Sequence, residues 1–106
     1  MNQDPSITAI SLALDAALMR QTAIANNIAT INSSNFQNLE VNFEQQFGFN
    51  ENLSSIKPFY ELSQKATSIE EQLSKNVQNM THYRALIKGL NQKFSIMKLA
   101  LQGINQ

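Results

Sequence analysis

Apolar residues recur at alternating steps of three and four toward both ends of this chain. In the N-terminal run, seven of the eight positions on this spacing are apolar: Ile7, Ile10, Leu14, Ala17, Gln21, Ile24, Ile28 and Ile31. In the C-terminal run, ten of eleven are apolar: Ile69, Leu73, Asn76, Met80, Tyr83, Ile87, Leu90, Phe94, Met97, Leu101 and Ile104. This alternation is typical of helices that pair as coiled coils. The sequence therefore predicts an all-α fold in which two long terminal helices form an antiparallel coiled-coil hairpin.

Capping residues indicate where both helices begin. Asp4 precedes Pro5, and an Asp N-cap followed by proline in the first turn favours a helix start. Ser68 and Glu71 have the spacing of a capping box, in which each side chain satisfies a backbone N–H of the first turn. We therefore expect the two helices to start at these residues.

The middle of the chain carries weaker helix signals. Apolar and polar residues alternate from Leu39 to Glu44, which predicts a short extended segment. The stretch from Phe59 to Ala66 is interpreted as a helical lead-in to the last helix. The chain is thus divided into three segments of one structural domain: an N-terminal helix and turn at 1–35, a partly irregular middle at 36–67, and a C-terminal helix at 68–106.

The two apolar runs differ in length. At about 1.5 Å per residue, the first spans roughly 37 Å and the second roughly 54 Å. The second helix should therefore overhang the first and leave apolar residues for another chain. Each run also holds one amide, Gln21 or Asn76. A crude register with Ile31 opposite Ile69 brings these amides within one turn, so either they pair or each points to the rim.

Charge narrows the range of partners. The 106 residues carry eight acids and eight bases, and the net charge of zero gives no general attraction to nucleic acid or anionic lipid. All eight acids lie in residues 1–71, whereas residues 72–106 hold five bases and no acid. This basic segment is either a solvated helix face or a match for an acidic part of a neighbouring subunit. Asn and Gln account for 24 residues, and their hydrogen bonds depend little on salt.

The sequence offers few residues for catalysis. It has no cysteine and one histidine, His82, and a lone histidine on a helix is more often a surface or packing residue than a metal ligand. We therefore expect no enzyme activity, no cofactor and no metal site. The N-terminus lacks the basic and apolar regions of a secretory signal, and Asp15 interrupts the only long apolar run. No transmembrane segment is expected.

The end of the first helix has a distinctive sequence. The run from Arg20 to Phe36 reads RQTAIANNIATINSSNF. It resembles the N-terminal signature of flagellar basal-body rod and hook proteins, in which an arginine precedes an Ala-Asn-Asn-Ile-Ala-Asn-like helix end that leads into Asn-Thr-Pro-Gly and an aromatic residue. Thr30 replaces the last asparagine, and Ser33-Ser34-Asn35 stands where the family has Thr-Pro-Gly. Asn and Ser both favour turns, so the turn is expected to persist.

The C-terminal helix is similar to that of the proximal-rod members of this family. In those proteins a tyrosine-containing helix runs through a Lys-Phe pair to a terminal glycine. The matching positions here are Glu71, Asn76, Met80, Tyr83, Leu86, Leu90, Lys93, Phe94, Lys98, Ala100 and Gly103. Hook and distal-rod proteins carry a large β-domain between their terminal helices, and the middle of this chain leaves no room for one.

The resemblance implies a structural subunit of the proximal rod, which polymerises through its terminal helices into the torque-transmitting, channel-enclosing shaft. It implies passage through the flagellar type III export apparatus without a cleaved signal peptide, and assembly in the periplasmic part of the basal body. The implied partners are further copies of the chain, an FlgC-like rod protein, an FliE-like adaptor and the MS-ring. Because such a chain has an unfilled interface before assembly, we also expect a monomer that is partly disordered, mainly at its termini.

Residues expected at polymerisation contacts come from both helices: Arg20, Asn26, Asn27, Ile28, Ala29, Asn32, Phe36, Asn76, Tyr83, Lys93 and Phe94. The three asparagines of the signature either cap backbone groups locally or bridge subunits, and Phe36 is expected to anchor the turn. Two alternatives belong to other classes. A small secreted helical-hairpin effector commonly carries a Trp-X-Gly turn, which this tryptophan-free chain lacks. A generic coiled-coil adaptor does not predict the Asn-Asn-Ile-Ala signature.

Overall fold

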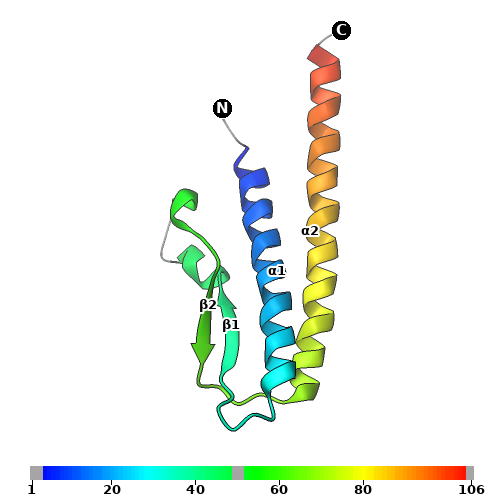
Figure 1. The fold of residues 1–106 in the computed structure, drawn as a ribbon. Coiled ribbons are helices and arrows are strands. Elements are labelled where there is room, and N and C mark those ends of the chain that lie inside the picture. The colour runs from blue at the N-terminus through cyan, green and yellow to red at the C-terminus, as the bar shows by residue number, and fades with distance from the viewer. Residues whose placement is uncertain (1–3, 49–51, 105–106) are drawn as a thin grey trace.

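The computed structural model describes residues 4–48 and 52–104, so the outer ends of the first and last predicted segments lie outside the described residues (Figure 1). In chain order the elements are helix α1 (Pro5–Thr30), strand β1 (Asn38–Asn42), the short 3-10 helices η1 (Glu44–Gly48) and η2 (Leu53–Ser55), strand β2 (Phe59–Ser63) and helix α2 (Ile69–Ile104). The molecule is elongated, with extents of 65 × 27 × 18 Å. The β-hairpin, α1 and α2 lie side by side along the long axis, with α1 in the middle.

Both predicted helix starts are confirmed by their caps. Asp4 Oδ1 accepts a 2.8 Å hydrogen bond from the backbone N–H of Ser6, and Pro5 is the first residue of α1. At the start of α2, the Ser68 hydroxyl accepts a 3.1 Å hydrogen bond from the backbone N–H of Glu71. Each cap satisfies an N–H group that has no partner within its own helix.

The two terminal helices pair antiparallel, as predicted, and α2 continues beyond the start of α1 (Figure 1). The α2 helix has 36 residues and α1 has 26. Lys93 Nζ lies 2.9 Å from Asp4 Oδ2, which places the start of α1 level with residue 93 of α2. The last eleven residues of the described α2 therefore extend past α1, and we call residues 94–104 the overhang.

The all-α prediction is wrong, because the middle of the chain forms a two-stranded antiparallel sheet. The strands pair from Asn38 opposite Ser63 to Asn42 opposite Phe59. The predicted extended segment corresponds to β1, whereas most of the predicted helical lead-in, from Phe59 onward, is strand β2. A helix of so few residues is unstable alone, while a strand beside β1 obtains backbone hydrogen bonds and suits aromatic residues.

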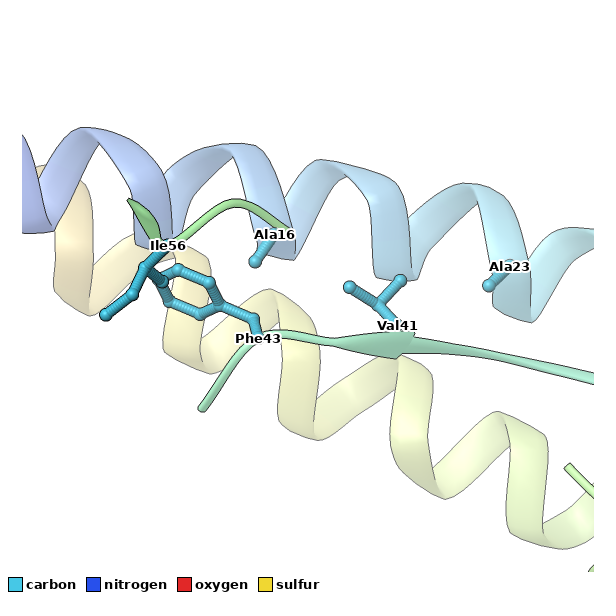
Figure 2. Close-up of a cluster of buried hydrophobic side chains, with 5 residues drawn as sticks. All are labelled: Ala16, Ala23, Val41, Phe43 and Ile56. Atoms are coloured by element: carbon cyan, nitrogen blue, oxygen red, sulfur yellow. The ribbon is translucent and has the colours of Figure 1, made fainter. Parts of the chain in front are cut away.

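The hairpin is positioned by a second apolar face of α1, which the coiled-coil alternation does not include. Ala16 and Ala23 on α1 pack against Val41, Phe43 and Ile56 (Figure 2). Partly buried residues from both sides surround this cluster: Leu12, Ala13, Met19, Leu39 and Leu53. The alanines are small, so the strand lies close to the helix. As a result α1 is covered on one side by the hairpin and on another by α2.

The face that α2 turns toward α1 differs in part from the predicted one. Gln72 and Asn79 are buried, whereas Leu73 and Met80, each one position further along, are 50% and 40% exposed. Asn79 Nδ2 donates a 2.8 Å hydrogen bond to the carbonyl oxygen of Ala17. This contact places the helix register within about one turn of the crude prediction.

The predicted pairing of the two seam amides is not found. In the described part of the chain no hydrogen bond joins Gln21 to Asn76. Gln21 is exposed, and the buried Oδ1 of Asn76 has no partner there. The side chain of Ile104, the last predicted seam position, lies outside the described residues. The buried amides that connect α2 to the rest of the fold are instead Gln72 and Asn79.

Candidate functional site

Asn27 binds the backbone of β1 through its side chain. Its Nδ2 donates to the carbonyl oxygen of Leu39 at 2.9 Å, and its Oδ1 accepts from the N–H of Leu39 at 2.9 Å. A carboxamide carries one donor side and one acceptor side, as a peptide group does. Asn27 therefore occupies the edge of β1 that faces away from β2, much as another strand would.

Further amides extend this contact into a buried network, which we call the amide junction: Asn27, Asn38, Thr67 and Gln72. Asn27 Nδ2 also lies 3.1 Å from Asn38 Oδ1 and 3.2 Å from Gln72 Oε1. Gln72 Nε2 donates to the Thr67 hydroxyl at 2.8 Å, and Asn38 Nδ2 donates to the Lys65 carbonyl at 3.4 Å. The junction joins the end of α1, the start of β1, the β2–α2 connection and the first turn of α2.

The amide junction is almost completely buried and carries no charge. Asn27, Asn38 and Gln72 are 1%, 3% and 1% exposed. Buried polar groups without partners cost about 1–3 kcal/mol each, so a network of this kind tolerates few changes. It fixes the angle at which the hairpin and α2 leave the end of α1.

A groove of about 380 Å³ lies between β1 and α2, with α1 as its floor. Its lining includes the charged or titratable side chains of Arg20, Glu40, Lys75 and His82. Lys75 Nζ lies 3.9 Å from Glu40 Oε2 and 3.8 Å from Glu71 Oε1. In the described ranges no three His, Asp or Glu side chains come together in a group that could hold a metal ion. The groove is thus a polar seam that the Lys75–Glu40 ion pair bridges between β1 and α2.

Arg20 forms a two-pronged ion pair with Glu44 at one end of this groove. Arg20 Nη1 lies 3.1 Å from Glu44 Oε2, and Nη2 bonds Oε1. Partial burial alone would raise the pKa of Glu44, but hydrogen bonds from Arg20 and from the backbone, with the charges of Arg20 and His82, outweigh it and lower that pKa. The signature arginine thus ties α1 to η1, the segment after β1.

The predicted contact residues fall into distinct environments. Arg20, Asn27 and Lys93 make bonds between elements. Ile28, Phe36, Asn76 and Tyr83 are half-buried, and Phe36 lines a hollow beside the end of β2. The others are exposed: Asn26, Ala29, Asn32 and Phe94. The structure brings Arg20 and Asn27 to one groove and leaves the rest spread over the molecule.

Sequence reasoning missed several residues that connect the elements. Asn38 and Gln72 were not expected in the amide junction, Asn79 was not expected to bind α1, and Glu44 was not expected as the partner of Arg20. Gln72 and Asn79 are seven residues apart, so they occupy equivalent positions in successive heptads. In a chain rich in amides, this spacing could have indicated that both side chains face α1.

Helix α1 is long and apolar enough to cross a membrane: its most apolar stretch of 18 residues has a mean hydropathy of 1.2. In the fold its two apolar faces pack on the hairpin and on α2, and it carries the buried Asn27. Core helices have the same length and composition, so we interpret α1 as the central helix of this fold.

No protein-family model, curated protein or solved structure matches this chain.

Proposed function

We propose that this chain is a structural subunit of the bacterial flagellar basal body, a proximal-rod protein of the FlgB type that polymerises through its terminal helices. In this proposal it has no enzyme activity. It is exported through the flagellar type III apparatus without a cleaved signal, and it assembles beside an FlgC-like protein, an FliE-like adaptor and the MS-ring.

One observation supports the proposal above the others. Asn27, the second asparagine of the Ala-Asn-Asn-Ile-Ala signature, is 1% exposed and binds both backbone groups of Leu39. Its neighbour Asn26 is exposed. The resemblance thus rests on a residue with a defined physical task, which is to hold the hairpin and α2 against the end of α1. If the sequence match were due to chance, it would not be expected to include the buried side chain that bonds to Asn38, Leu39 and Gln72.

The shape of the chain also supports an assembly subunit. The overhang presents large apolar side chains to solvent, among them Phe94, Ile96 and Leu99, which are 50%, 62% and 67% exposed. Patches of this kind mark protein–protein contacts. A secreted helical-hairpin effector is less well supported, because its helices are expected to join through a short turn and not through a β-hairpin.

Deletion of the gene, followed by electron microscopy of basal bodies and a swimming assay, tests the proposal. We expect the deletion strain to lack rods and to be non-motile. A plasmid copy of the wild-type gene should restore motility, and so should Asn91→Asp, at an exposed position outside the predicted contact residues, whereas Asn27→Asp should restore little. Intact rods and normal swimming in the deletion strain would overturn the assignment.

A further inference from the structure

The overhang is apolar over most of its circumference, apart from one polar strip formed by Ser95, Lys98 and Gln102. At 100° per residue, Phe94 and Leu101 lie on one side of the helix, while Ile96 and Leu99 lie on the other. All four are at least half exposed. A helix that exposes large apolar side chains on two opposite sides is normally covered at an interface. The overhang therefore needs neighbours that cover it from outside the chain.

A second apolar surface lies near the opposite end of α2, and we call it the bare face: Leu18, Ile69, Leu73, Val77 and Met80. The four α2 residues follow steps of four, four and three, so they share one side of the helix. Leu18 on α1 lies level with this part of α2, because the carbonyl of the preceding residue, Ala17, accepts a hydrogen bond from Asn79. These five side chains are between 38% and 64% exposed.

Charge distinguishes the two surfaces. The overhang carries Lys98 and no acid, and no ion pair to Lys98 is present among the described residues. The bare face begins beside Glu70 and Glu71. Glu71 lies 3.8 Å from Lys75, whereas Glu70 has no ion-pair partner within the described ranges. A basic apolar end and an acidic apolar face on the same chain are complementary between two copies.

The geometry of α2 prevents these surfaces from meeting within one molecule. Lys98 and Glu70 are separated by about 28 residues of continuous helix, or roughly 42 Å. Contact between them therefore requires a second copy. Because the two surfaces differ, the contact is head-to-tail, and a head-to-tail contact that does not close into a ring continues as a filament.

We propose that the overhang of one copy docks on the bare face of the next copy, with Lys98 near Glu70 and Leu99 near Leu73. This inference rests on the proposed function and specifies the contact through which the subunits polymerise. Neighbours in the resulting row are offset by roughly 40 Å along the helix axis. The β-hairpin packs on α1, away from this contact.

Disulfide trapping tests the geometry, because the chain has no cysteine of its own. Single variants Leu73→Cys and Leu99→Cys are mixed at high concentration and oxidised, and dimers are measured on non-reducing gels. The matched control replaces Leu73→Cys by Gln78→Cys, since Gln78 is on the same helix but lines the groove on the hairpin side. We expect dimers of Leu73→Cys with Leu99→Cys at several times the yield of the control. Equal yields, or efficient trapping of Leu73→Cys with itself, would overturn the proposal.

Charge reversal tests the pairing independently, with self-association followed by sedimentation velocity. Glu70→Lys and Lys98→Glu should each weaken association about two- to fivefold, as expected for one exposed ion pair per contact. The double variant should recover most of the loss. A double variant that associates no better than either single one would refute the pairing.

Failure of this contact is distinguishable from failure of the proposed function. Absent trapping together with missing rods in the deletion strain would leave the rod assignment in place and reject the docking geometry. Specific trapping together with intact rods in the deletion strain would support the contact and reject the rod assignment.

Discussion

Lys93 and Asp4 meet at 2.9 Å across the open end of the helix pair. The Asp4 carboxylate therefore has two functions, because Asp4 also caps α1 through the N–H of Ser6. The Lys93 ammonium holds the pKa of Asp4 below its ordinary value, and the Ser6 hydrogen bond acts in the same direction. The start of α1 is thereby fixed to α2 at the last level where the two helices touch.

Removal of the Lys93 charge should raise the pKa of Asp4. In the Lys93→Gln variant the carboxylate loses its main stabilising partner, so an NMR titration of the Asp4 carboxyl should show its midpoint moving toward the ordinary value of 3.8. Lys98→Gln, one turn beyond the pair, serves as the control and should leave the midpoint in place. An unchanged midpoint in Lys93→Gln would show that the ion pair is absent in solution.

The Arg20–Glu44 pair predicts a small, pH-dependent stability difference. Because the folded-state pKa of Glu44 is lowered, the contribution of this carboxylate is fully present above the ordinary value of 4.5 and disappears as pH falls through the folded-state pKa. Glu44→Gln should lower the free energy of unfolding at pH 7 by less than about 1 kcal/mol, since Glu44 is half exposed. In urea titrations, the free energies of unfolding of the wild type and of Glu44→Gln should approach each other at acidic pH. A difference that persists undiminished at pH 3 would contradict the assignment.

Asn27→Asp should destabilise the fold strongly. The new carboxylate can still accept from Leu39 N–H, but it cannot donate to Leu39, Asn38 or Gln72, and it places a charge at a buried position. We expect a loss of about 3 kcal/mol or more in urea unfolding at pH 7. The loss should shrink at acidic pH, because protonation restores a donor and removes the charge. Asn26→Asp, at an exposed neighbour, should change stability by less than about 0.5 kcal/mol.

Two phenylalanines in contact should differ sharply in their effect on stability. Phe43 is 2% exposed and packs in the core, whereas Phe47 is 46% exposed. Their rings meet edge to face at a centroid distance of 5.2 Å. Phe43→Ala should cost about 3–5 kcal/mol and release the hairpin from α1. Phe47→Ala should cost about 1 kcal/mol, mostly from the lost ring contact. Thermal unfolding followed by circular dichroism should rank the two in this order.

Truncation after Ser95 should affect solubility more than stability. The removed residues include Ile96, Leu99 and Leu101, which are all more than 60% exposed and so contribute little to the folded monomer. The melting temperature should shift by only a few degrees, while light scattering of concentrated samples should fall. A large loss of helical signal from the remaining chain would show that the overhang supports the fold from within.

The sequence was sufficient for the terminal helices and insufficient for what lies between them. Helix starts depend on local capping chemistry, so Asp4 and Ser68 were recognisable. The register of the helices was predicted to within about one turn because the apolar alternation restricts it. Strand β2 depends on pairing with β1, about twenty residues away, and its aromatic residues suit more than one structure.

The amide junction was harder to anticipate for a different reason. An asparagine or glutamine reads as a surface residue unless its partners are known, and the partners of Asn27 are 11, 12 and 45 residues away. The resemblance pointed to Asn27 without saying which groups it would bind. Gln72 was overlooked because the pattern of apolar residues favoured Leu73, which is half exposed in the folded chain.

The position of α1 between the hairpin and α2 has a mechanical consequence. A force applied to the hairpin reaches α2 along the chain from β2 and also through α1, by way of the Asn27 contact, the apolar cluster around Phe43 and the Arg20–Glu44 pair. These contacts are spread along the helix and load in parallel, in shear, so that a twisting force is shared among them instead of peeling them apart one at a time.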